Sequence, residues 1–163
     1  MDYPKRKRLR LPNYDYSSDG VYFLTICTKD RAPILSEISE TEKNGETVAT
    51  VTLTQTGTIV QQYLLSIPKA YPYISVDTYV LMPDHIHILL HVTSAPTRCA
   101  GSAKQPSAIA RTVAAFKRLT NQKCRQSLWQ DGYYDHIIRD AQDYQKRAEY
   151  IETNPLRRIL KKE

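Results

Sequence analysis

Long apolar runs, paired cysteines and glycine are all scarce in this sequence of 163 residues. No stretch approaches the roughly 18 apolar residues that a membrane-spanning helix needs, and the N-terminus has no apolar core typical of a secretion signal. The three cysteines are an odd number at wide spacing without a Cys-x-x-Cys pair, so the sequence indicates neither a disulfide framework nor a thiolate zinc knuckle. Five glycines and no low-complexity bias are not typical of a fibrous or wholly disordered chain. We expect one globular domain, 1–163, in the reducing cytoplasm, with no membrane partner.

Positive charge is in excess, because 23 lysines and arginines face 17 acidic residues and give a net charge of +6. This excess favours a polyanionic partner. Five of the first ten residues are basic, and we predict a basic N-terminal arm over residues 1–16. The alternative for this arm is a solvated tail. The 12 tyrosines could stack on bases or lie half-buried in strands.

The hydrophobic pattern predicts an α+β domain. Strands are expected at 21–28, 34–37, 47–53, 74–81, 85–92 and 129–138, and helices at 59–67, from Ser107 onwards and at 140–154. Residues 94–106 read as a flexible loop. This order predicts an antiparallel sheet with helices mainly on one face, related to the ferredoxin-like pattern.

Turn and proline signals set the expected ends of these elements. The polar residues 40–45 predict a loose hairpin tip, and three residues between 74–81 and 85–92 predict a tight hairpin. Pro68 is expected to stop the first helix. Asn154 precedes Pro155 and is expected to end the last helix, since the residue before proline is driven away from the α region.

The strongest chemical signal is a pair of histidines in an apolar strand. His85 and His87 are two residues apart and therefore project from one face of the strand, as does His91. A histidine-triad hydrolase would need a third histidine where Leu89 stands. A structural zinc site would need further cysteine or histidine ligands at suitable spacing. Two readings remain, a packed structural pair and a catalytic divalent cation held by two imidazoles and one oxygen ligand.

The helix predicted at 140–154 offers that oxygen. Tyr150 and Asn154 are four residues apart and share one face, while Tyr144, Ala148 and Ile151 form an apolar stripe that can bury against the sheet. The amide of Asn154 could complete a metal site with the Tyr150 phenol beside it. Each residue alone has a structural reading, as a core-rim tyrosine or a helix stop.

A family resemblance follows from segments that occur in the same order along nearly the whole chain. These are 6–11, 14–16, 22–28, the Met-Pro-Asp-His-Ile-His run at 82–87, 128–139 and the Tyr-Ile-Glu-Thr-Asn-Pro run at 150–155. Together they resemble the REP-associated tyrosine transposases, which are relatives of the single-tyrosine HUH transposases of bacterial insertion sequences.

The resemblance implies an HUH transposase fold that cleaves and rejoins single-stranded hairpin DNA through a 5′-phosphotyrosine intermediate. It implies Tyr150 as the nucleophile, and His85, His87 and Asn154 as residues at a Mg²⁺ or Mn²⁺ ion. Asp84 receives no role. From charge alone, we predict phosphate contacts by seven basic residues: Arg6, Lys7, Arg8, Arg10, Arg111, Lys117 and Arg118.

Two other functions remain open from the sequence. One is a non-catalytic module that binds hairpin DNA or RNA and regulates it. The other is a metal-dependent phosphodiesterase in which water attacks instead of Tyr150. The presence of both histidines with Tyr150 and Asn154 favours the transposase, acting on the nucleoid as a monomer or homodimer.

Overall fold

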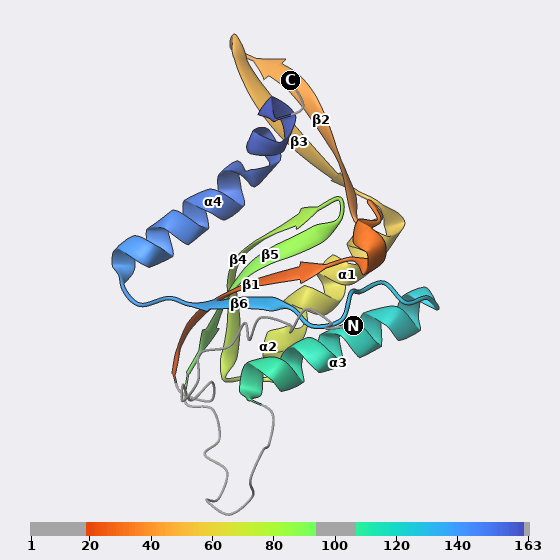
Figure 1. The fold of residues 1–163 in the computed structure, drawn as a ribbon, viewed down its shortest axis with the longest axis vertical. Helices are drawn as coiled ribbons and strands as arrows, with labels where there is room; N and C mark the ends of the chain where they lie inside the picture. Colours follow the sequence, from red (N-terminus) through yellow and green to blue (C-terminus); the bar gives the residue numbers. More distant parts are fainter. Residues whose placement is uncertain (1–18, 94–106, 162–163) are drawn as a thin grey trace, which may run out of the picture.

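A four-stranded antiparallel sheet forms the centre of the computed structural model, which describes residues 19–93 and 107–161. The strands run in the order β4 (Ile74–Met82), β5 (His85–Val92), β1 (Gly20–Cys27) and β6 (Tyr134–Ile137). The predicted arm and the loop at 94–106 lie outside the described residues. Figure 1 shows β1 and β5 in the middle of the sheet, where both faces are covered.

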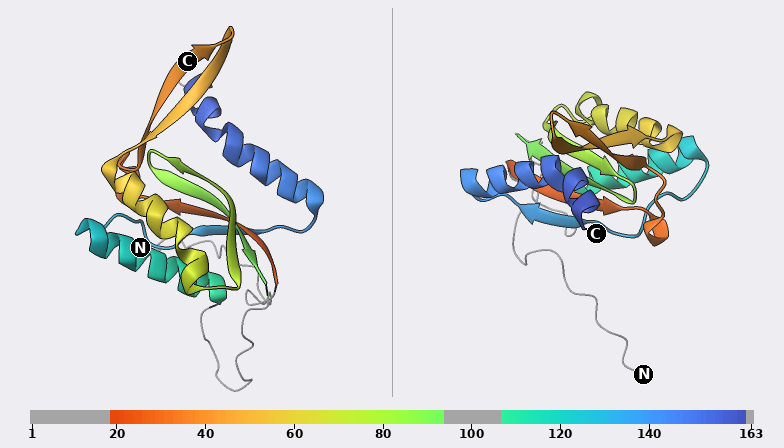
Figure 2. Two further views of the ribbon diagram at one scale, coloured as in Figure 1. Left: turned by 180° about the vertical axis from the view of Figure 1, so that it is seen from behind. Right: turned by 90° about the horizontal axis from the view of Figure 1, so that it is seen from above.

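The connections between these strands follow the ferredoxin-like βαββαβ order. Helix α1 (Gln55–Leu65) and the short α2 (Ile67–Ala70) link β1 to β4, and α3 (Ala108–Cys124) links β5 to β6. These helices lie on one face of the sheet, and α4 (Ala141–Leu160) lies on the other (Figures 1 and 2). The predicted fold class is therefore confirmed.

The alternation of side chains along β1 and β5 separates two apolar clusters. Leu24 and Ile88 face α1 and α3, in a large cluster that includes Leu64 and Phe116. The opposite face holds a small cluster of Phe23, Leu89 and Ile151, with Tyr144 and Ala148 packed against it. The predicted apolar stripe of the last helix thus lies on the sheet, on the same face as the histidines.

A two-stranded ribbon is inserted between β1 and α1, and its tip differs from the prediction. Strands β2 (Ser36–Lys43) and β3 (Glu46–Leu53) pair along their whole length, so the tip is a two-residue turn rather than a loose loop. Asn44 and Gly45 have φ values of 55° and 79°, as the twist of a type I′ hairpin turn requires. Figure 1 shows the ribbon projecting from the sheet, next to the C-terminal end of α4.

The sequence predicted that the last helix ends at Asn154, and this prediction is wrong. Helix α4 continues through Pro155 to Leu160. Proline removes one backbone hydrogen bond, but Pro155 is buried and Arg158 reaches Asp84 across the site, so tertiary contacts stabilise the additional turn. The extension adds Arg157 and Arg158 to the helix.

Two other predicted boundaries also change. Helix α1 ends at Leu65, and Pro68 lies in the first turn of α2, where its missing N–H costs little. The segment predicted as a strand over 129–138 pairs as β6 only over Tyr134–Ile137, and Trp129 forms an isolated bridge with Thr28. In the two described ranges, no helix has the length and apolar character required to cross a membrane.

Candidate active site

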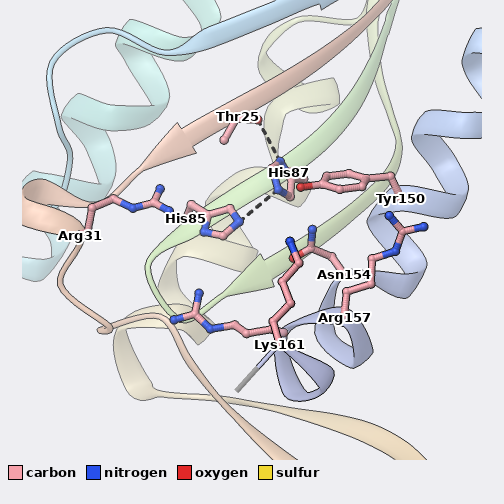
Figure 3. Close-up of a pocket in the computed structure, with 9 residues that line it drawn as sticks. Thr25, Arg31, His85, His87, Tyr150, Asn154, Arg157 and Lys161 are labelled. Carbon is pink, nitrogen blue, oxygen red and sulfur yellow. Dashed lines mark hydrogen bonds between the residues drawn. The ribbon is translucent and has the colours of Figure 1, made fainter. Parts of the chain in front are cut away.

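The two histidine rings of β5 meet at the centre of the candidate site. The Nε2 atoms of His85 and His87 are 3.0 Å apart. Each Nδ1 atom has an oxygen partner, since Asp84 Oδ1 lies 2.8 Å from His85 Nδ1 and Thr25 Oγ1 lies 2.9 Å from His87 Nδ1. Asp84 and Thr25 therefore hold the two Nδ1 atoms in place, and the two Nε2 atoms face each other. Figure 3 shows the contacts of Thr25 with His87 and of His85 with His87.

Both imidazoles are neutral at physiological pH. Burial, together with the nearby His85 and Arg31, lowers the pKa of His87 to about 3. Burial also lowers the pKa of His85, although Asp84 acts in the opposite direction. The Asp84 carboxylate can only accept, so His85 carries its proton on Nδ1, and His87 Nε2 donates to His85 Nε2.

This assignment of the tautomers defines the hydrogen bond between Thr25 and His87. With its proton on Nε2, His87 accepts from the Thr25 hydroxyl at Nδ1. Both Nε2 atoms can offer lone pairs to one cation only when the His87 proton is on Nδ1, and Nδ1–H then donates a hydrogen bond to the Thr25 hydroxyl oxygen. A hydroxyl suits this position because it can donate or accept.

Tyr150 reaches the histidine pair from α4. Its ring centroid is 5.1 Å from that of His87 and 6.2 Å from that of Phe23, both in edge arrangements. Phe23 in turn stacks on His87 at 5.3 Å. In Figure 3 the phenol oxygen points toward His87, so the three rings fix the direction of the hydroxyl.

One pocket of about 550 Å³ joins these side chains. The structure brings together the four residues predicted for the site, His85, His87, Tyr150 and Asn154, and Asn154 is 9% exposed. The remaining lining residues are Thr25 and four cations: Arg31, Arg157, Arg158 and Lys161. A pocket with four cations favours an anionic ligand.

Asp84 links three parts of the site, although no role is predicted for it from the sequence. Its carboxylate contacts His85, lies 3.1 Å from Arg31 Nε and accepts from Arg158 Nη1 at 2.9 Å. Burial opposes ionisation of Asp84, but the hydrogen bond with His85 and the positive charges of Arg158 and Arg31 lower its pKa. Asp84 therefore connects a histidine, the turn after β1 and α4.

The basic residues predicted on α3 are not part of this pocket. Helix α3 packs on the opposite face of the sheet, so Arg111, Lys117 and Arg118 are separated from the histidines by the sheet. Lys117 Nζ donates to the carbonyl oxygens of Gln130 and Gly132, and burial lowers its pKa. Phosphate contacts by these three side chains stay a prediction, as do those by Arg6, Lys7, Arg8 and Arg10, which lie outside the described residues.

None of the four pocket cations was predicted as a site residue, and only some of them have a recognisable spacing in the sequence. Arg157 and Lys161 follow Tyr150 by seven and eleven positions on one helical face. Ending the helix at Asn154 hid that spacing. Arg31 had no such signal, because Asp30 and Arg31 both adopt left-handed φ values, 54° and 56°, in the short 3₁₀ helix η1 (Lys29–Arg31).

The donor set fits a small divalent cation. Two cis ligands of an octahedral ion at about 2.1 Å are about 3.0 Å apart, which agrees with the separation of the two Nε2 atoms. In the part of the chain that is described, no group of three histidine, cysteine or acidic side chains could hold a metal. A third protein ligand would therefore have to be of another type, such as the buried amide of Asn154.

Similarity to known proteins shows the family of this chain. Residues 17–154 match the family described as Transposase IS200 like, and the chain belongs to this family. It is 26% identical, over 90% of its length and 77% of the relative's, to a protein of Haemophilus influenzae named as a REP-associated tyrosine transposase. An uncharacterized protein of the same organism is 28% identical, with 93% and 88% covered.

A solved structure supports the same fold. The structure of a REP-associated tyrosine transposase bound to a REP hairpin superposes with a TM-score of 0.63. The superposition covers 91% of this chain and 74% of the other, at 16% identity. The resemblance inferred from the sequence is therefore confirmed.

Proposed function

We propose that this protein cleaves and rejoins single-stranded hairpin DNA in the cytoplasm, with Tyr150 as the nucleophile. The observation that carries the proposal is the position of the Tyr150 hydroxyl, beside a neutral histidine pair in a pocket lined by four cations. Hairpin DNA is proposed as the substrate because a relative of the same fold is bound to a REP hairpin.

In the proposed reaction the Tyr150 oxygen forms a bond to the scissile phosphorus while the bond to the 3′ oxygen breaks. The products are a 5′-phosphotyrosine and a 3′-hydroxyl that has gained a proton. The energy of the phosphodiester bond is retained, so a second 3′-hydroxyl can reverse the step on another strand. Strand transfer then needs no nucleotide triphosphate.

Activation of the phenol is the main chemical demand. A free tyrosine with a pKa near 10 is about 0.1% ionised at neutral pH, which adds about 4 kcal/mol to the barrier. Arg157, whose Cζ lies 5.7 Å from the Tyr150 ring centroid, is the pocket cation that contacts the ring of the nucleophile. The other three pocket cations can hold non-bridging phosphate oxygens.

A Mg²⁺ or Mn²⁺ ion held by His85, His87 and Asn154 would supply Lewis-acid polarisation of the scissile phosphate. The protein's contribution is to orient the ligands. Asp84 fixes the tautomer of His85, and the Thr25 hydroxyl would accept a hydrogen bond from His87 Nδ1 when the His87 proton is on that nitrogen. Asn154 lies about one helical turn after Tyr150, so α4 positions both the nucleophile and the proposed third ligand.

Tyr150→Phe tests the proposal. This variant removes only the hydroxyl and keeps the ring contacts with His87 and Phe23. Labelled hairpins from the organism's own genome are incubated with Mn²⁺ and each protein, and covalent adducts are separated under denaturing conditions. We expect an adduct with the wild type only, and hairpin binding within a few-fold for both.

The other outcomes separate the competing functions. Cleavage at an undiminished rate by Tyr150→Phe would indicate attack by water, as in a phosphodiesterase. Tight hairpin binding by the wild type without cleavage or adduct would indicate a non-catalytic binding module.

A further inference from the structure

We propose that a second pocket beside Tyr150 binds the phosphate backbone of single-stranded DNA next to the scissile phosphate. Six residues line this pocket of about 340 Å³: Asp143, Lys146, Arg147, Glu149, Tyr150 and Arg157. It shares Tyr150 and Arg157 with the histidine pocket, so the two pockets adjoin at the nucleophile. That the ligand of this second pocket is single-stranded DNA rests on the proposed function.

The spacing of cations along α4 suits an extended polyanion. Lys146 and Arg147 lie about one helical turn before Tyr150, and Arg157 lies about two turns after it. From 146 to 157 the helix rises about 16 Å. A strand whose scissile phosphate is at Tyr150 therefore has cations on both sides along the same helix.

Two of the three cations are held in place by aromatic rings. Arg147 Cζ lies 5.3 Å from the Phe23 ring centroid, and Arg157 Cζ lies 5.7 Å from that of Tyr150. Arg147 is held further by Asp143, whose Oδ1 is 3.5 Å from Arg147 Nε. An arginine that is already ordered loses less side-chain entropy when it binds a phosphate.

The acidic residues of this pocket do not cancel its attraction for phosphate. Asp143 is paired with His136 at 2.7 Å as well as with Arg147. Glu149 is exposed, and its one negative charge is outnumbered by the three positive charges of the pocket's lysine and two arginines. The balance favours an anion that several cations contact together, which is the chemistry of a nucleic-acid backbone.

The test measures binding without cleavage. The double substitution Lys146→Gln with Arg147→Gln is made in the Tyr150→Phe protein, and the probe is a DNA hairpin with a single-stranded oligo(dT) foot. Affinity is titrated across a salt series. Two lost contacts to a single strand are expected to reduce the slope of log affinity against log salt by about 1.4.

Lys69→Gln in the same Tyr150→Phe protein is the matched control. It removes one exposed positive charge from α2, which packs on the other face of the sheet. We expect its slope to equal that of Tyr150→Phe. A second variant, Arg147→Lys with Lys146 retained, keeps both charges and should keep the slope, while melting curves verify that all variants fold.

Neutral methylphosphonates then locate the contact. Placed one at a time along the foot, they should weaken binding by Tyr150→Phe severalfold at one or two positions, and those penalties should vanish in the double substitution. The same penalties in both proteins, an unchanged salt slope, or a foot that adds nothing to affinity would each overturn the inference.

Adduct formation by the wild-type protein is measured separately. If no adduct forms but the penalties depend on Lys146 and Arg147, the proposed cleavage fails and the binding pocket stands. If the adduct forms and the penalties do not depend on them, the pocket alone fails.

Discussion

The two faces of the central sheet differ in how their helices are held. On the face covered by α1, α2 and α3, the cluster contains 18 buried apolar residues of the described chain. On the face covered by α4, the apolar cluster of the described chain consists of Phe23, Leu89 and Ile151, and polar contacts such as Arg158 with Asp84 also hold the helix. One face therefore supplies most of the hydrophobic stability, and the other carries the polar groups that chemistry needs.

The largest expected effect is on the histidine face. His85→Ala and His87→Ala should each reduce adduct formation by more than about 100-fold, and chelation by EDTA should do the same to the wild type. Asn154→Ala should cost about tenfold, because an amide is the weaker ligand. Rates are measured by denaturing gel at several Mn²⁺ concentrations. Activity that survives thorough chelation would return both histidines to a structural role.

The next effect concerns the link between the histidines and α4. Asp84→Asn should reduce adduct formation by about 10-fold to 100-fold, because it weakens both the orientation of His85 and the contact with Arg158. Arg158→Gln removes the second contact only, and serves as the matched variant. Calorimetric titration with Mn²⁺ should show weaker binding for Asp84→Asn alone. Equal Mn²⁺ affinity in both variants would show that Asp84 acts only by holding the helix.

The local patterns explain why the histidine face could be predicted. Alternation in 85–92 depends only on the geometry of a strand, and it put both histidines on one face. The starts of two helices also depend on local contacts, because the Ser107 and Asp140 side chains accept hydrogen bonds from backbone N–H groups three residues later. Tyr150 and Asn154 shared a face by helical spacing alone.

The parts that could not be predicted depend on contacts between distant segments. Arg158 lies 74 residues from Asp84 in the chain, and no spacing rule connects them. The helix passes Pro155 because contacts beyond the proline outweigh its local cost. Lys117 likewise donates to the carbonyl oxygen of Gln130, 13 residues away in the chain, whereas the sequence showed only a positive charge on a helix.

A smaller effect is expected from the N-terminal arm. Deletion of residues 1–10 removes five positive charges, and five lost contacts to a single strand would reduce the salt slope by about 3.5. We expect a loss of at least about two units, measured with a hairpin and full-length or truncated protein. A solvated tail would leave the slope unchanged, and α3 would then be the next surface to test, through Arg111→Gln with Arg118→Gln.

The smallest effect on chemistry should come from the apolar face. Leu64 is 0% exposed in the cluster beneath α1. Leu64→Ala should lower the free energy of unfolding by about 3 kcal/mol and the melting temperature by roughly 10 °C.

Below that melting temperature, the rate of adduct formation per folded molecule of Leu64→Ala should stay within about twofold of wild type, since the substitution creates its cavity on the far side of the sheet. Leu89→Ala is the matched comparison. Leu89 is equally buried but belongs to the α4 face, in the cluster that Tyr150 packs against. A cavity there leaves α4 less well held, so both stability and adduct formation should fall. If Leu64→Ala slowed the folded enzyme as much as Leu89→Ala does, the two faces would be coupled through the sheet, and the division of stability and chemistry between them would be wrong.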